Sequence, residues 1–106
     1  MIYNILSIFN RICILTVRSP NWKKVRDKYL KNHPLCEICG SNTKLHVHHI
    51  IPVHVDKNKE LEEDNLITLC GQHCHFVFGH LMSWRSYNSN VRADAEFFKS
   101  KILNRP

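Results

Sequence analysis

The stretch CEICGSNTKLHVHHIIP, residues 36–52, decides how this 106-residue chain folds. It opens with Cys36 and Cys39, which have two residues between them and are followed directly by a glycine. Two thiolates at this spacing can reach one ion across a tight turn, which is the form of a zinc knuckle. In residues 45–51 apolar and polar side chains then alternate, and several are β-branched, so this segment predicts a strand that Pro52 ends. The stretch therefore predicts a metal-bound turn that leads into a strand.

A second cysteine pair completes the set of sulfur ligands. Residues 65–69 predict a second strand, which leads into Cys70, and Cys74 follows four residues later. Four cysteines are a closed tetrahedral set, typical of structural rather than catalytic zinc. The second pair has one residue more between its cysteines than usual, so His73 is the alternative to Cys74 as fourth ligand; we expect Cys74. Metal-bound rather than disulfide-bonded cysteines favour a reducing, cytoplasmic setting.

Helices are predicted on both sides of this centre. Ser19 and Pro20 are a typical helix start, and the helix should end before Pro34. Its exposed face carries lysines and arginines, which next to a metal site become candidates for phosphate contacts. Residues 53–64 are predicted as a loop and residues 75–83 as a short helix. Asn90 should cap a last helix whose buried stripe is Val91, Ala95, Phe98 and Ile102.

Charge and length limit the remaining possibilities. At 106 residues the chain has room for one domain, and a formal charge of +6 favours a polyanionic partner. Residues 1–17 are apolar but interrupted by polar side chains, and they lack a basic start and a small-residue cleavage site. We interpret them as an N-terminal extension that packs on the domain of residues 18–106 or on a second subunit. No membrane association is expected.

The histidines are the chemical signal. Seven of the eight lie between His46 and His80, and His48 and His49 are adjacent in the first strand, so they should point to opposite faces. One can then bind a metal while the other acts as a general base on water, since a neutral imidazole suits that task. A divalent ion can supply the charge stabilisation that phosphodiester cleavage needs.

Four elements in order carry a family resemblance: Cys36-x-x-Cys39, His48-His49-x-x-Pro52, Asp64-Asn65 before Cys70, and Cys74-His75. They resemble the HNH endonucleases, including members common in phages, over residues 19–88. The resemblance implies an α+β fold with a ββα-metal, treble-clef-like core, a structural zinc and flanking helices. It implies that His49 is the general base, that Asn65 holds the His49 loop, and that His48 and His75 bind a catalytic Mg²⁺ or Mn²⁺.

His80 is the candidate third ligand, although it lies five residues after His75, where an ordinary α-helix does not align two side chains. The residues expected to contact nucleic acid are Lys23, Lys24, Arg26, Lys28 and Arg85. Trp84 and Tyr87 are expected to pack in the core, with stacking on bases as the alternative.

The resemblance thus implies a DNA endonuclease that nicks one strand per subunit, with a homodimer or phage packaging proteins as candidate partners. The alternative from another class is a non-catalytic zinc-finger module that binds nucleic acid or protein. It leaves unexplained why His48, His49, Asn65 and His75 occur together at nuclease spacing. A membrane-tethered toxin that uses residues 1–17 is the third possibility.

Overall fold

A computed structural model describes residues 18–105, so the predicted extension 1–17 lies outside the described residues. The order of the main elements is α2 (Trp22–Asn32), β1 (Leu45–His49), β2 (Leu66–Cys70), the π-helical turn η3 (His75–Gly79) and α3 (Val91–Leu103). Two short 3-10 turns, η1 (Lys57–Lys59) and η2 (Glu63–Asn65), lie in the segment between the strands. The α+β class is therefore confirmed. No helix among residues 18–105 is long and apolar enough to cross a bilayer.

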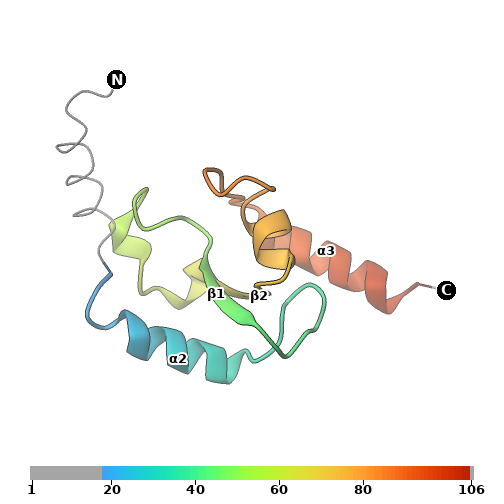
Figure 1. The fold of residues 1–106 in the computed structure, drawn as a ribbon, viewed down its shortest axis with the longest axis horizontal. Coiled ribbons are helices and arrows are strands. Elements are labelled where there is room, and N and C mark those ends of the chain that lie inside the picture. Colours follow the sequence, from blue (N-terminus) through green and yellow to red (C-terminus); the bar gives the residue numbers. More distant parts are fainter. Residues whose placement is uncertain (1–17, 106) are drawn as a thin grey trace.

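An antiparallel hairpin of β1 and β2 is the centre of the fold (Figure 1). Its register pairs Leu45 with Cys70 at one end and His49 with Leu66 at the other. Every residue of β2 is buried. The reason is that α2 covers one side of the hairpin, while η3 and α3 lie on the other (Figure 1). The Tyr29 hydroxyl of α2 donates to the Leu66 carbonyl at 2.9 Å and ties that helix to β2.

The two faces of β1 receive different neighbours. His48 faces η3, where its ring meets His75, whereas His49 faces α2, where its ring lies 4.4 Å from the Trp22 ring centroid. This opposite orientation is what the alternation of a strand requires. The strand ends at His49 rather than at residue 51, because the Asn65 side chain bonds the backbone of Ile51 outside the ladder.

Three other sequence predictions need correction at element ends. The first helix begins at Trp22, because the Ser19 hydroxyl accepts from the Asn21 amide in a turn before it rather than capping it. The predicted helix 75–83 is only the turn η3, which two left-handed residues, Leu81 and Met82, terminate. The last helix begins after Asn90 as predicted, but the Asn90 side chain makes no capping hydrogen bond.

The buried stripe predicted for α3 is only half correct. Val91 and Ala95 are buried in the core, but Phe98 and Ile102 are 39% and 41% exposed. Phe98 packs against Phe78 of η3, with ring centroids 4.9 Å apart, and the end of α3 extends past the hairpin (Figure 1).

Candidate functional site

The four cysteines gather where β1 begins and β2 ends. Their sulfur atoms all lie within 4.8 Å of one another, and the Cys39 and Cys70 sulfurs are 3.8 Å apart. Zinc–sulfur bonds of about 2.3 Å in a tetrahedron give sulfur–sulfur edges of roughly 3.8 Å. The cluster is therefore positioned for zinc binding, as the sequence predicted.

A tight turn closes the first cysteine pair. The Gly40 amide donates to the Cys36 carbonyl at 3.0 Å, and Gly40 has a φ of +77°, which explains why glycine ends the turn. Burial raises the pKa of the Cys70 thiol, but hydrogen bonds from the Cys74 and His73 amides outweigh it and bring the pKa to about 6. Burial raises the pKa of Cys74, so ion binding would release a proton from that thiol.

His73, the alternative fourth ligand, lies beside the cluster. Its Nδ1 is 3.4 Å from the Cys74 sulfur and 3.6 Å from the Cys70 sulfur. The mutually close set of four contains Cys74 and not His73. The geometry therefore favours Cys74 as the ligand, with His73 as a neighbour of its sulfur.

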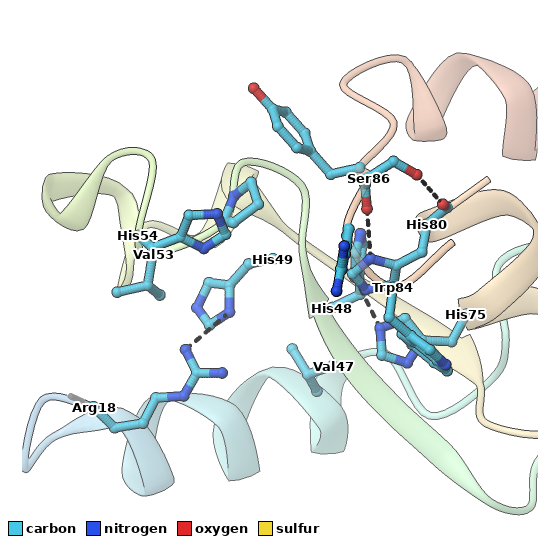
Figure 2. A pocket seen from close by; sticks show the side chains of 13 residues that line it. Arg18, Val47, His48, His49, Val53, His54, His75, His80, Trp84 and Ser86 are labelled. Atoms are coloured by element: carbon cyan, nitrogen blue, oxygen red, sulfur yellow. Dashed lines mark hydrogen bonds between the residues drawn. The ribbon is translucent and has the colours of Figure 1, made fainter. Parts of the chain in front are cut away.

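A second cluster consists of the histidines His48, His75 and His80. Each offers one ring nitrogen, and the three nitrogens lie within 4.8 Å of one another. His48 Nδ1 and His75 Nε2 face each other at 3.0 Å (Figure 2). Among the described residues, His48 Nε2 is the only buried side-chain nitrogen or oxygen without a hydrogen-bond partner. Three converging imidazoles, one of which has a ring nitrogen without a hydrogen-bond partner, fit a divalent metal ion.

The π-helical turn explains how His80 joins this cluster. The His80 amide donates to the His75 carbonyl five residues earlier, at 3.1 Å. This wider turn brings residues five apart onto one face, which the α-helical spacing used for the sequence prediction does not. Gly79 makes the close approach possible, because a Cβ there would meet the His48 ring at 3.2 Å.

These imidazoles are in the state that a metal requires. Burial is the main cause that lowers the pKa of His48, to about 3, and that of His75, to about 4, with neighbouring histidines adding to both shifts. His80 Nδ1–H donates to the Ser86 carbonyl at 2.8 Å, so its Nε2 carries the free lone pair (Figure 2). At neutral pH His48 and His75 are therefore uncharged and able to bind a cation.

His46 supports this cluster without belonging to it. Its Nδ1 lies 3.0 Å from His75 Nδ1, on the nitrogen of His75 that does not face His48. Its ring occupies the space above Gly71, where a Cβ would lie 2.5 Å from the ring carbon Cε1. Histidines that bind metals commonly have their second nitrogen held by such a partner.

His49 lies on the other side of the strand but lines the same pocket. Its Nε2–H donates to the Glu60 carbonyl at 2.9 Å, which leaves Nδ1 as the accepting nitrogen. Nδ1 receives a hydrogen bond from Arg18 Nη1 at 3.4 Å (Figure 2). Burial lowers the pKa of His49, against the effect of the Glu60 carbonyl, so the ring is neutral near pH 7.

Arg18 is a pocket residue that sequence reasoning missed. It lies over the Trp22 ring, 5.2 Å from the centroid, and the next residue is fixed because the Ser19 amide donates to the buried Glu60 carboxylate at 2.8 Å. The adjacent Ser19 and Pro20 predict a helix start, and nothing in the sequence near Arg18 predicts a contact with His49.

Asn65 fixes the loop that follows His49. Its side-chain oxygen accepts from the Ile51 amide at 2.9 Å, and its amide group donates to the carbonyls of Ile51 and Lys59, both at 3.1 Å. These bonds join the end of β1, the η1 segment and the start of β2. The geometry matches the cross-hairpin contact that the resemblance implied for Asn65.

The pocket has a volume of about 300 Å³ and opens between His49 and the histidine cluster. Arg85 lines it, but the basic residues predicted on α2 do not; these are Lys23, Lys24, Arg26 and Lys28. Asp27 pairs with both Lys23 and Arg26, which reduces the charge of that helix face. Trp84 and Tyr87 also line the pocket and are exposed, so the expectation that they pack in the core is wrong.

The comparisons with known proteins agree with this geometry. Residues 36–76 match the family model described as HNH endonuclease, a segment that contains the four cysteines, the hairpin and His75. No curated protein and no solved structure gives a significant match. The hairpin, its cysteine cluster and the first residues of η3 thus match the HNH endonuclease family model.

Proposed function

We propose that this protein is a metal-dependent DNA endonuclease in which His49 activates water and His48, His75 and His80 hold one divalent ion. The observation that carries the proposal is the orientation of His49. Its Nε2–H is committed to a backbone carbonyl, and its Nδ1 is left as an acceptor that contacts Arg18, in a pocket that the three converging histidines also line. General bases are recognised by such a fixed tautomer and reach.

The reaction follows from these positions. His49 Nδ1 accepts a proton from water, whose oxygen forms a bond to phosphorus while the bond from phosphorus to the 3′ oxygen breaks. The leaving oxygen takes a proton from solvent, so the products are a 5′ phosphate and a 3′ hydroxyl. A divalent ion such as Mg²⁺ or Mn²⁺ would neutralise the phosphate and stabilise the leaving oxygen. Arg18 and Arg85, the arginines that line the pocket, would bind the phosphates.

The remaining residues would position the general base and the metal ligands. Asn65 ties the loop after His49, and the Glu60 carbonyl fixes the His49 tautomer. His46 would hold the second nitrogen of His75. The cysteine cluster would bind zinc as a structural ion, because four thiolates leave no position for a substrate. With one histidine cluster per chain, each subunit would cut one strand.

A plasmid assay tests the proposal. Supercoiled DNA is incubated with the purified protein and Mg²⁺ or Mn²⁺, in parallel with His49→Ala. Loss of a general base costs about 10²- to 10⁴-fold in rate, so the variant should nick at a small fraction of the wild-type rate. His33→Ala is the matched control, because this histidine stacks on Tyr29 and does not line the pocket.

The assay also separates the non-catalytic alternative. DNA binding with no cleavage by the wild-type protein, at any of the metals tried, would favour a zinc-finger module. Equal nicking by wild type and His49→Ala would contradict the role of His49.

A further inference from the structure

Trp84 lies at the rim of the pocket with its ring held by site residues. Its ring centroid is 4.8 Å from that of His80 and 5.4 Å from that of His75 (Figure 2). It also lies 4.9 Å from the ring centroid of Phe76. The side chain is nevertheless 62% exposed. An indole fixed on one side and open on the other presents a flat apolar surface to the pocket.

The loop that carries Trp84 has an unfavourable conformation. Leu81 and Met82 are consecutive residues with φ of +53° and +65°, a left-handed conformation that is unfavourable for residues with a side chain. Hydrogen bonds hold the loop in place: the Met82 amide donates to the Phe76 carbonyl at 2.9 Å, and the Ser83 amide to the His80 carbonyl at 3.0 Å. Met82 is also 67% exposed. Strain and apolar exposure together, beside a pocket, indicate a ligand-binding loop.

The position of Trp84 indicates which ligand. The ring contacts His75 and His80, two of the three histidines that would hold the ion and its phosphate. A nucleotide whose phosphate lies there has its base within reach of the indole. Arg85 and Tyr87, from the same segment of the chain, also line the pocket and supply a cation and a second aromatic ring.

We propose that Trp84 is a stacking platform for an unpaired base next to the scissile phosphate, so that the site prefers single-stranded or locally unpaired DNA. This inference rests on the proposed function. Every base has a π-face, so stacking on an indole binds a base without reading its sequence. In a paired duplex both faces of a base are covered by its neighbours, and exposing one costs unpairing energy.

Binding measured without cleavage tests the platform. In the full-length chain carrying His49→Ala, fluorescence anisotropy gives the affinity for three labelled DNAs: a single strand, the same strand with abasic positions, and the paired duplex. Adding Trp84→Ala should weaken single-strand binding about 5- to 150-fold, the range measured for one stacked base. Trp84→Phe, which keeps an aromatic ring, should retain most of the affinity. Phe97→Ala is the control, because Phe97 is an exposed aromatic residue on α3 outside the pocket.

The abasic strand makes the result specific. The His49→Ala protein should bind it about as weakly as the double variant binds the normal strand, and Trp84→Ala should cause no further loss. Equal losses for abasic and normal strands, or an affinity unchanged by Trp84→Ala, would overturn the platform. A shift from dimer to monomer in sedimentation caused by Trp84→Ala would assign the ring to a second copy of the chain and would also overturn it.

Failure of the platform differs from failure of the nuclease. If wild type nicks DNA and Trp84→Ala has normal affinity, the proposed function stands and the platform does not. If wild type cuts nothing but binds single strands through Trp84, base stacking on Trp84 stands and the proposed nuclease function fails.

Discussion

The hairpin carries two clusters of metal-ligating side chains that differ in closure. The cysteine cluster brings four sulfurs together, three of them on buried residues. The histidine cluster brings only three nitrogens together and lies on a pocket. A site with four protein ligands holds its ion for structure, whereas one with three leaves a position for water or substrate. Under the proposed function, this difference would assign stability to the first cluster and chemistry to the second.

The largest effect is expected from removing a ligand of the cysteine cluster. Zinc binding to such sites contributes about 10–16 kcal/mol, which matches or exceeds the whole stability of a small domain. Cys74→Ala should therefore lose both the zinc and the folded structure, as measured by metal analysis and circular dichroism. His73→Ala is the control and should keep one zinc per chain. The opposite result, zinc loss only in His73→Ala, would make His73 the ligand.

Removing one ligand from the histidine side should leave the fold intact. His80→Ala should retain the zinc and the melting temperature of the domain within a few degrees, since His80 is only partly buried and belongs to no strand. Binding of Mn²⁺, measured by titration calorimetry, should weaken strongly, and plasmid nicking should fall about 100-fold or more because the ion's charge is needed at the leaving oxygen. A collapse of the fold like that of Cys74→Ala would contradict the division of roles.

The sequence was sufficient for the cysteine cluster and insufficient for parts of the histidine cluster. Cys36, Cys39, Cys70 and Cys74 are identified by spacing, because two knuckle-like pairs meet wherever the strands between them pair. His80 was uncertain because ligand spacing on a helix assumes α-geometry, and a single π-turn changes which residues share a face. Arg18 could not be found from spacing, because it reaches His49 through the fold, 31 positions away. Phe98 and Ile102 follow a helical stripe that continues past the end of the core.

A smaller change tests how His75 is held. Gly71→Ala would place a Cβ 2.5 Å from the His46 ring and displace it, although the backbone of Gly71 is not left-handed. Loss of the partner on His75 Nδ1 should weaken ion binding about 10- to 100-fold, the usual effect of such supporting contacts. The zinc content should not change.

A double-mutant cycle isolates the cause. In the His46→Ala background Gly71→Ala should have no further effect on Mn²⁺ affinity, because the ring it displaces is absent. His46→Asn should restore part of the affinity, since the Asn oxygen can take the place of the histidine Nδ1. Additive losses in the cycle would show that Gly71 acts on the hairpin itself.

The smallest expected effect comes from Glu60, which lies outside both clusters. Its buried carboxylate accepts from the Ser19 amide at 2.8 Å and from Lys57 Nζ at 2.7 Å, while its backbone carbonyl holds His49. Glu60→Gln should lower the free energy of unfolding at pH 7 by about 1–2 kcal/mol, because hydrogen bonds to a charged acceptor are lost. Cleavage should stay close to wild type and both metals should remain bound, since the backbone carbonyl is unchanged.

The pH dependence of that loss gives its cause. Burial raises the pKa of Glu60, but Lys57 and the Ser19 amide outweigh burial, so the folded-state pKa lies below the ordinary value of 4.5. The carboxylate therefore stabilises the fold fully above that value, and its contribution is lost as pH falls through the folded-state pKa. Urea unfolding should give a constant difference between wild type and Glu60→Gln at neutral pH, and a difference that narrows as the pH is lowered toward 4.5 and below. A difference independent of pH would mean that packing, and not the charge of Glu60, holds the segment that positions Arg18 beside His49.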